Sequence, residues 1–425
     1  MKSITLINPP APWLINQRSH HPLGILALAG FLRENGCEVV IADLAGEDER
    51  DIPESDCYGI TAVTPQILIA EKICREIKKR NAGAVVILGG IHASVLPEET
   101  LGRFGFDALV AGEGEGALLD IVSGREFSAI GNLAWRDGGK ITINSKRPLI
   151  KSLDALPFPA YDLIDVTSYS PTGIRNMMTM TTSRGCPFRC AFCTHTYISG
   201  GKYRAMSAGR VVEEVEYIID RFGITAFSFQ DELFTANRKR FLELCDAFGR
   251  LGIEWKFLSR VDRMDCDMMK AAVEAGAFQV SVGVESGSQT ILDNLEKGIK
   301  KEDTAKALAA AREAGIKTFA FMMVNCPGET DGTVEETIEF LKENPADEYA
   351  LMMYVPFPGD KVWSGPEEFG FVIPPDYGQY QYLNRSGMGI SFMKDKEKAE
   401  KRFRRLAGFL GEKTSFHRDR GVVGG

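Results

Sequence analysis

The chain has 425 residues, 44% of them hydrophobic and 25% charged, which is typical of a globular protein with two or three domains. Its formal net charge of -8 argues against a broad phosphate-binding surface, so nucleic acid is not an expected partner. The chain has neither the roughly eighteen consecutive apolar residues of a membrane span nor the apolar core of a signal peptide, and its nine cysteines suit reduced thiols, so we expect a cytoplasmic protein.

The first third of the chain alternates short apolar runs with helical patterns, which predicts a doubly wound parallel sheet. The expected strands cover residues 4–7, 38–42, 58–62, 85–88 and 108–110, and the expected helices cover residues 23–34, 67–80, 98–104 and 115–122. Residues 131–144 have the pattern of a hairpin that closes this domain. In such sheets, ligands bind beyond the carboxyl ends of the strands.

The loops after these strands are rich in glycine, which lets a backbone approach a ligand closely. Residues 87–94 (Ile-Leu-Gly-Gly-Ile-His-Ala-Ser) and 110–115 (Val-Ala-Gly-Glu-Gly-Glu) together resemble the cobalamin-binding domain that precedes many radical S-adenosylmethionine (SAM) domains. The resemblance implies that the nucleotide tail of cobalamin lies along these loops and that the corrin faces the next domain. The implied cobalamin contacts are Asn8, Pro9, Thr61, Thr64, Gly89, Gly90, His92, Glu113 and Gly114.

One motif of other B12 proteins, the Asp-x-His-x-x-Gly sequence whose histidine binds cobalt from below, is absent. The nearest match is Ser19–Gly24, in which Ser19 replaces the aspartate that would orient the imidazole of His21. We therefore interpret His21 as a loop residue and leave the lower cobalt ligand open.

A second family places a domain before its radical SAM loop, the tRNA methylthiotransferases. Its members carry three cluster cysteines in that domain and a terminal β-rich RNA-binding domain. Here Cys37, Cys57 and Cys74 have the pattern of small core residues, and no basic β-rich segment ends the chain. This alternative is weak.

Residues 1–145 are therefore expected to form the cobalamin-binding domain, and the Pro-rich residues 146–175 a linker.

Cys186, Cys190 and Cys193 stand in a C-x3-C-x2-C pattern inside a turn that contains Gly and Pro. Cysteine thiolates at short loop spacings hold iron–sulfur clusters, and three ligands leave one iron open. With Phe192 before the last cysteine, the pattern resembles the signature of the radical SAM superfamily. The resemblance implies a 4Fe-4S cluster whose open iron is chelated by SAM. Structural zinc is the alternative, for which His195 is the only nearby fourth ligand.

Six strands with intervening helices follow the linker, as expected for the partial (β/α)6 barrel of radical SAM enzymes, over residues 176–360. The expected strands cover residues 177–182, 226–229, 254–259, 279–284, 317–324 and 349–355. The expected helices cover residues 208–221, 238–250, 265–275, 301–314 and 333–343. A barrel of parallel strands places its chemistry at the carboxyl ends of the strands.

The strand ends of this second half carry polar residues that match the family's SAM contacts. The residues that the resemblance assigns to SAM are Phe192, Asp231, Glu232, Ser259, Arg260 and Glu285. Asp231 has a second interpretation as a helix N-cap, and Glu285 is expected to face the barrel mouth because it follows an apolar strand directly. Cys326 lies in a Pro-Gly-Glu-Thr motif and is expected to be a filler, since a fourth cluster ligand would block SAM.

Residues 361–425 form an extension whose aromatic first part, up to residue 389, fits a lid, a substrate pocket or an anchor to the core. A basic amphipathic helix is expected over residues 397–410.

The resemblance implies a cobalamin-dependent radical SAM enzyme, in the first place a methyltransferase that acts on an unactivated carbon through a 5′-deoxyadenosyl radical and methylcobalamin. Its substrate would be a small molecule or biosynthetic intermediate, and a flavodoxin or ferredoxin would donate electrons. A second hypothesis keeps both cofactors without methyl transfer, as in cyclisation by the anaerobic porphyrin-ring cyclase. A third is a non-enzymatic module that binds zinc or a corrinoid. The sequence does not give the substrate.

Overall fold

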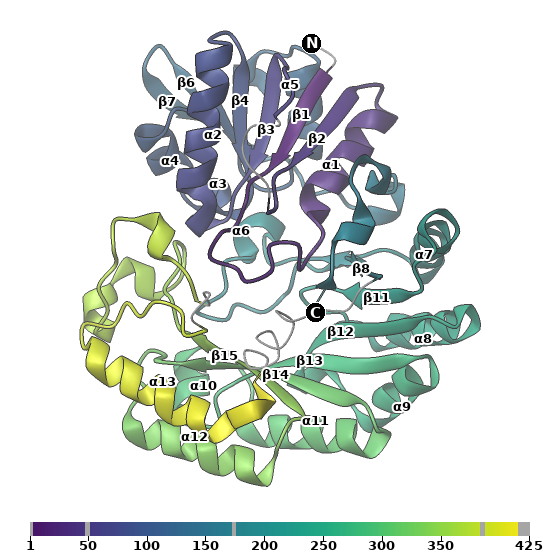
Figure 1. Ribbon diagram of the computed structural model, residues 1–425, viewed down its shortest axis with the longest axis vertical. Helices are drawn as coiled ribbons and strands as arrows, with labels where there is room; N and C mark the ends of the chain where they lie inside the picture. The colour runs from purple at the N-terminus through teal and green to yellow at the C-terminus, as the bar shows by residue number, and fades with distance from the viewer. Residues whose placement is uncertain (1–2, 47–51, 172–175, 383–386, 415–425) are drawn as a thin grey trace.

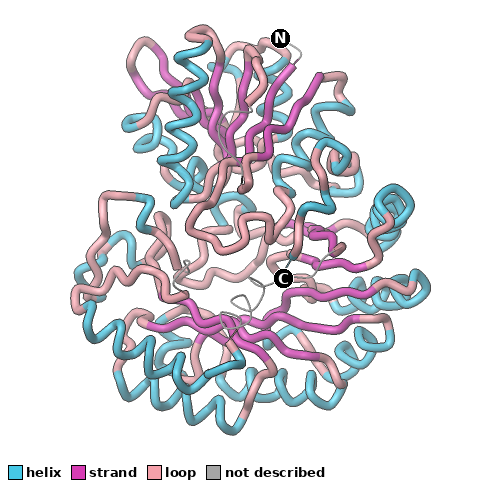
Figure 2. Tube along the Cα trace, viewed as in Figure 1, coloured by secondary structure: helices cyan, strands magenta, loops and turns pink. Residues whose placement is uncertain are grey.

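The computed structural model describes residues 3–46, 52–171, 176–382 and 387–414. These residues build a seven-stranded sheet, a six-stranded sheet and a two-stranded sheet. In the view of Figures 1 and 2 the seven-stranded sheet lies above the six-stranded sheet, and loops lie between the two. One sheet comes from the N-terminal third of the chain and the other from the middle.

The N-terminal sheet has seven strands in the order β2-β1-β3-β4-β5-β6-β7, of which the first five are parallel and the last two antiparallel. The strands are β1 (Ser3–Asn8), β2 (Glu38–Asp43), β3 (Cys57–Thr61), β4 (Val85–Gly89), β5 (Ala108–Val110), β6 (Leu133–Asp137) and β7 (Lys140–Ile143). The helices are α1 (Leu23–Glu34), α2 (Ile67–Arg80), α3 (Ile91–Val95), α4 (Pro97–Arg103) and α5 (Glu115–Val122). Helices cover both faces of the parallel strands, which explains their nearly continuous apolar sequences.

The doubly wound sheet and the hairpin strands β6 and β7 agree with the sequence patterns. One segment differs, because residues expected to form a loop after β4 include the short helix α3. Pro97 at the first turn of α4 separates the two helices, since proline suits a helix start and lacks the N–H of a helix interior.

The second sheet has six parallel strands in the order β15-β14-β13-β12-β11-β8, and it curls as a partial barrel (Figure 2). The strands are β8 (Met177–Met180), β11 (Ala226–Phe229), β12 (Glu254–Arg260), β13 (Ala277–Glu285), β14 (Lys317–Val324) and β15 (Glu348–Met353). The helices are α6 (Thr196–Ser199), α7 (Ala208–Phe222), α8 (Arg238–Leu251), α9 (Cys266–Glu274), α10 (Gln289–Asn294), α11 (Lys301–Ala314) and α12 (Asp331–Glu343). The short strands β9 (Ser183–Arg184) and β10 (Arg204–Ala205) pair antiparallel beside it.

Alternation along these strands separates an apolar face from a more polar one. Phe229, Trp255 and Phe257 point to the helices, and their ring centroids lie within about 6 Å of one another or of Phe248. On the other face, Ser228 and Lys256 are register partners and both are buried. The apolar face carries the main core, and the polar face lines the inside of the partial barrel.

The free edge of this sheet, β8, is covered by the loop that follows β1. The backbone N–H of Thr179 donates to Nδ1 of His21 at 3.2 Å, and the His21 backbone N–H donates to the Thr179 hydroxyl at 3.1 Å. Edge strands leave backbone groups unpaired, so His21 satisfies a group that would otherwise lack a partner.

The C-terminal extension is anchored to both halves of the molecule. Tyr377 and Tyr380 are buried in one apolar cluster with residues of the N-terminal sheet and with Met323 of β14. The Tyr377 hydroxyl donates to Glu99 of α4 at 2.5 Å, and helix α13 (Lys396–Leu410) packs beside α12 (Figure 1). The aromatic side chains of this segment therefore anchor it to the core, which was one of the interpretations of their sequence.

Candidate functional site

The three cysteines of the C-x3-C-x2-C pattern lie on the loop between β9 and α6, where they are half-buried and free. The loop starts at Gly185, whose φ is +86° and whose Cβ, if present, would lie 2.3 Å from the carbonyl oxygen of Lys202. Only glycine fits there. The backbone N–H of Cys193 donates to the carbonyl of Cys190 at 3.0 Å, which folds the loop back on itself.

The donor set of this loop fits an iron–sulfur cluster. Among the described residues, no three His, Cys, Asp or Glu side chains converge on a point that could hold a single metal ion. A cubane does not need such convergence, because each thiolate binds a different iron. Burial raises the pKa of Cys193 to about 11 and also raises that of Cys186, so these thiols are protonated unless a metal binds.

Arg260, at the end of β12, holds the cluster loop from the barrel side. Its Nη1 donates to Cys190 Sγ at 3.6 Å, and its guanidinium lies 3.7 Å from the ring centroid of Phe188. Nε donates to Asp262 at 2.9 Å and Nη2 to the carbonyl of Lys297 at 2.8 Å. The expected SAM contact of Arg260 stays a prediction, while its contact with a cluster cysteine is a finding of the structure.

Glu232, after β11, faces the same loop. Its carboxylate accepts from the backbone N–H of Gly185 at 3.1 Å and lies 3.3 Å from Nδ1 of His195. Burial opposes ionisation, but His195 and the amide outweigh it and the pKa of Glu232 is lowered. The pairing raises the pKa of His195, the residue considered as a fourth zinc ligand.

Asp231 is fully buried beside it and has a different role. Its carboxylate accepts from the backbone N–H of Thr182 at 3.1 Å, from the Thr182 hydroxyl at 2.9 Å and from the Ser183 hydroxyl. It therefore fixes the chain that leads into the cluster loop. The N-cap of α8 is Asn237, not Asp231. The structure favours Glu232 over Asp231 for a direct contact with a ligand.

Ser259 and Glu285, the other strand-end residues, are both buried. The Ser259 hydroxyl lies 2.6 Å from that of Thr235, and Glu285 forms an ion pair with Lys297 at 2.5 Å. Glu285 adopts φ +64° at an irregularity of β13, a backbone conformation that is rare for residues other than glycine and common at functional sites. The residue is 6% exposed, and its expected position facing the barrel mouth stays a prediction.

Phe192 and Cys326 complete the barrel residues singled out in the sequence. Phe192 is half-buried against the apolar cluster shared with the extension, and Cys326 is 2% exposed in the same cluster. The burial of Cys326 agrees with the interpretation of this residue as a filler.

The loops at the carboxyl ends of β1, β3 and β4 bring together most of the expected cobalamin residues. Asn8 donates to Asp43 at 2.8 Å, Pro9 accepts a bond from Gln66 at 3.0 Å, and the Thr64 hydroxyl lies 3.3 Å from Nδ1 of His92. Burial lowers the pKa of His92 to about 4, so its imidazole is neutral.

Two features of these loops suit a bound ligand. His92 is only 1% exposed, and its buried Nε2 has no hydrogen-bond partner, which is unusual for a buried polar atom. Gly89 has open space where a Cβ would stand. Gly90 adopts φ +94°, and a Cβ added to it would lie 2.7 Å from the carbonyl oxygen of Ala62. Thr61, whose hydroxyl lies beside Gly90, is half-buried.

Glu113, in the loop after β5, joins the two halves of the chain. Its carboxylate accepts from Arg184 at 3.0 Å, from Arg204 at 2.9 Å and from the backbone N–H of Ile150 at 2.9 Å. Glu115 pairs with Arg184 at 2.7 Å. Arg184 directly precedes the cluster loop, so this carboxylate positions that loop, and its expected contact with cobalamin stays a prediction.

His21 and Gly114 have structural contacts. Nε2 of His21 lies 3.0 Å from the carbonyl of Val166, its Nδ1 lies 2.5 Å from the Thr179 hydroxyl, and the ring stacks on Tyr169. Both ring nitrogens are occupied, in agreement with a loop residue that does not bind cobalt. A Cβ on Gly114 would lie 3.2 Å from Leu28, so Gly114 allows α5 to pack on α1.

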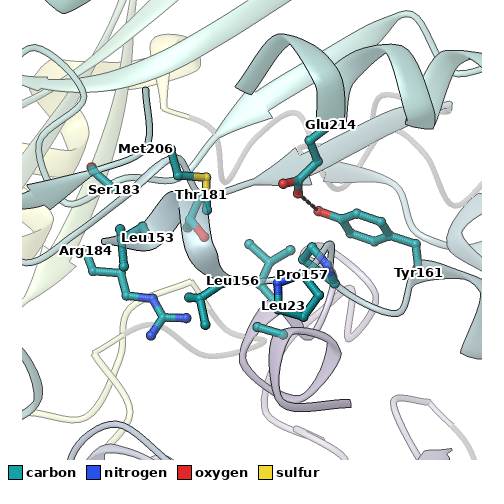
Figure 3. Close-up of a pocket in the computed structure, with 12 residues that line it drawn as sticks. Leu23, Leu153, Leu156, Pro157, Tyr161, Thr181, Ser183, Arg184, Met206 and Glu214 are labelled. Atoms are coloured by element: carbon teal, nitrogen blue, oxygen red, sulfur yellow. Dashed lines mark hydrogen bonds between the residues drawn. The ribbon is translucent and has the colours of Figure 1, made fainter. Parts of the chain in front are cut away.

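A hollow of about 500 Å³, counted with the solvent at its mouth, lies between α1, residues 153–161 and the start of the cysteine loop (Figure 3). Residues 153–161 are called the connecting segment below. Leu23, Pro157 and Arg184 are among its lining residues, and none of the three loop cysteines is. At one side of the hollow, the Tyr161 hydroxyl donates to Glu214 at 2.7 Å. This contact anchors the connecting segment to α7, and the hollow is separate from the cysteine site.

Comparison with known proteins identifies both halves. Residues 180–341 match the family model of the Radical SAM superfamily, and residues 17–122 match that of the B12 binding domain. Over 378 residues the chain is 33% identical to the uncharacterized methyltransferase PH0819 of Pyrococcus horikoshii, which covers 85% of this chain and 82% of that protein. The chain belongs to the radical SAM enzymes that carry a B12-binding domain. The family, its fold and its cofactors, namely a 4Fe-4S cluster, SAM and cobalamin, are therefore confirmed.

One further relative and one solved structure extend the comparison. The anaerobic magnesium-protoporphyrin IX monomethyl ester cyclase of Rubrivivax gelatinosus is 29% identical, over 95% of this chain and 81% of that protein. The radical SAM methyltransferase TsrM of Kitasatospora setae, solved with cobalamin and a 4Fe-4S cluster, superposes with a TM-score of 0.71 at 19% identity, over 88% of this chain and 79% of TsrM. This superposition supports the fold. No helix in the described part of the chain is long and apolar enough to cross a membrane.

Several residues of the site were missed in the sequence. Lys297 pairs with Glu285, Arg204 pairs with Glu113, and Glu115 pairs with Arg184. Each partner lies 12 or more residues away along the chain, and no local motif marks these pairings. The only indication in the sequence was the position of Arg184, a charged residue just before the first cysteine of the motif, Cys186.

Proposed function

We propose that this radical SAM enzyme is a cobalamin-dependent methyltransferase that acts on an unactivated carbon of a small molecule or biosynthetic intermediate. The observation that carries the proposal is the contact of Arg184 with the buried carboxylates of Glu113 and Glu115, which ties the start of the cysteine loop to the loop after β5 of the B12-binding domain. Two cofactor sites held together in this way serve one substrate space. The methyltransferase name of the Pyrococcus horikoshii relative supports the same reaction class.

Each cofactor has a set of residues that would hold it. Cys186, Cys190 and Cys193 would bind the cluster. SAM would lie against Phe192, Glu232, Ser259, Arg260 and Glu285, with Asp231 fixing the strand end behind them. The cobalamin loops would contribute Asn8, Pro9, Thr61, Thr64, Gly89, Gly90 and His92, with Gly114 and Glu113 beside them. When bound, the cluster and SAM supply a 5′-deoxyadenosyl radical and cobalamin supplies a methyl group.

The roles assigned to residues of the chain are to bind and orient these groups. Glu232 is ionised, because its pKa is lowered, and it can balance the charge of an ammonium group. The neutral imidazole of His92 offers a buried nitrogen without a partner. The apolar cluster around Phe192, Tyr380 and Val355 excludes water from one side of the cysteine loop.

We further propose the arrangement and the cellular context of the enzyme. Residues 1–145 would form the cobalamin-binding domain, 146–175 the linker, 176–360 the radical SAM barrel and 361–425 the extension. A flavodoxin or ferredoxin would reduce the cluster. A cytoplasmic location would suit the cysteines, which are all free thiols in the structure.

A second candidate function keeps both cofactors without methyl transfer, as in cyclisation or ring rearrangement. The cyclase of Rubrivivax gelatinosus favours it, because its match covers 95% of this chain. The mass of the product distinguishes the two, since only methyl transfer adds a methyl group.

The test is anaerobic reconstitution with iron, sulfide and hydroxocobalamin, followed by metal and corrin analysis and an assay for 5′-deoxyadenosine from SAM under a strong reductant. Cys190→Ala should lose the cluster and SAM cleavage. Cys266→Ala, a free cysteine on α9 outside the loop, is the matched control and should keep both. SAM cleavage without bound corrin would contradict the methyltransferase. Zinc in place of iron, with no cleavage, would favour a non-enzymatic module.

A further inference from the structure

Among the hydrogen bonds of the described residues, one connects a charged side chain to a cysteine of the cysteine loop, and its donor is Arg260. Its Nη1 lies 3.6 Å from Cys190 Sγ, within hydrogen-bond reach of sulfur. The residue is 7% exposed, so water does not screen this contact as it would a surface pair.

The guanidinium is held in this position by three further partners. Asp262 accepts from Nε at 2.9 Å, the Lys297 carbonyl accepts from Nη2 at 2.8 Å, and the ring of Phe188 lies 3.7 Å below the guanidinium. Phe188 is itself part of the cysteine loop, between Cys186 and Cys190. Arg260 therefore contacts the loop at two points while the barrel fixes it from behind, which is the preorganised geometry of a positioning residue.

We propose that Arg260 is a positioning residue that raises the reduction potential of the cluster by donating a charge-assisted hydrogen bond to the Cys190 sulfur. The proposal rests on the proposed function only in that a cluster must bind to the three cysteines. A cluster gains one negative charge when it is reduced. A buried cation bonded to a ligand sulfur stabilises the reduced form more than the oxidised form. Hydrogen bonds to the sulfurs are an established control of such potentials.

Arg263 offers a matched control on the same ring. Its guanidinium lies 5.2 Å from the Phe188 centroid, and it also approaches Asp262, at 3.8 Å. Its side chain is 47% exposed, and its described ion pair and ring contact involve no cysteine. The charge of Arg263 should therefore have little effect on the reduction potential of the cluster, because solvent screens it.

The test is an anaerobic redox titration of the reconstituted protein with titanium(III) citrate, followed by electron paramagnetic resonance, without SAM, substrate or cobalamin. Arg260→Gln should lower the equilibrium constant for reduction about tenfold, a shift of about 59 mV to more negative potential for one electron. Arg260→Lys keeps the charge but not the fork that reaches Asp262, Lys297 and sulfur together. It should shift the potential in the same direction by less. Arg263→Gln should leave it unchanged.

Iron content is measured first for each protein. If Arg260→Gln binds no iron, the lysine variant decides the outcome. A variant cluster with the wild-type potential would overturn the proposal and would assign Arg260 to SAM alone, because a residue that acts only on SAM has no effect in its absence. Equal shifts in Arg260→Gln and Arg263→Gln would also overturn it. Failure of the wild-type protein to assemble any cluster would instead refute the proposed function.

Discussion

Glu113→Gln should destabilise the protein strongly although the residue lies in a loop. The wild-type carboxylate is 8% exposed and receives bonds from Arg184, Arg204 and the Ile150 amide. Removing one partner from a buried ion pair costs about 3–5 kcal/mol, because it leaves a charge buried without a counter-charge. Arg184 keeps Glu115, but Arg204 loses its carboxylate, and two of its nitrogens already lack partners.

The lower end of that range, about 3 kcal/mol, is therefore expected. Equilibrium urea unfolding of the apo protein, followed by far-ultraviolet circular dichroism, measures it. Glu335→Gln is the matched control, since its pair with Arg405 is about half exposed and should contribute less than about 1 kcal/mol. Equal losses in the two variants would refute the view that burial makes the Glu113 network important.

The same carboxylate gives this contribution a pH dependence. Burial opposes its ionisation, but the Ile150 amide and Arg184 outweigh burial, and the pKa of Glu113 is lowered. A group whose folded-state pKa is depressed stabilises the fold above its unfolded pKa, near 4.3 in a model peptide, and loses this effect as the pH falls through the folded value. The difference between wild type and Glu113→Gln should therefore be constant near neutral pH and shrink in acid.

Two further predictions concern single positions. Gly90→Ala should lower the free energy of unfolding in urea by about 2–3 kcal/mol, because φ is +94° and the new Cβ would lie 2.7 Å from a carbonyl oxygen. Gly138→Ala, also at positive φ but in open space, should lower it by about 1 kcal/mol. Equal losses in the two variants would contradict the clash at Gly90. Burial raises the pKa of Glu329 to about 7, so the folded state retains a proton that the unfolded chain releases near 4.3, and wild-type stability falls as the pH rises between those values. Glu329→Gln should gain stability relative to wild type from pH 5 to pH 8, and parallel stability curves would argue against a buried neutral carboxyl.

The elements were predictable because each is specified by nearby residues. Apolar runs of strand length and helical periodicity gave the strands of both sheets within a few residues, and the parallel order followed from their alternation with helices. The short helices α3, α6 and α10 were not predicted, because helices of four to six residues are too short to show a period, and the Gly-Gly sequence before α3 indicates a turn.

The partners of the site residues were not predictable to the same degree. The sequence marks Asp231, Arg260 and Glu285 as residues at strand ends, but their partners depend on how the strands and loops pack. Asp231 fixes Thr182, Arg260 contacts Cys190 and Glu285 pairs with Lys297. A motif therefore indicates where a polar residue lies in a barrel more reliably than what its side chain contacts.

The cysteine loop is held from three directions, and this explains why its geometry depends on the whole chain. Arg184 ties its start to the B12-binding domain through Glu113, and Arg260 contacts it from β12. At Ala191, the backbone N–H donates to the Leu295 carbonyl at 2.8 Å, and the carbonyl accepts from the Lys361 N–H of the extension at 3.1 Å. A loop that spans three parts of the protein in this way is ordered only when all three are in place, so the site that needs iron becomes complete only in the assembled fold.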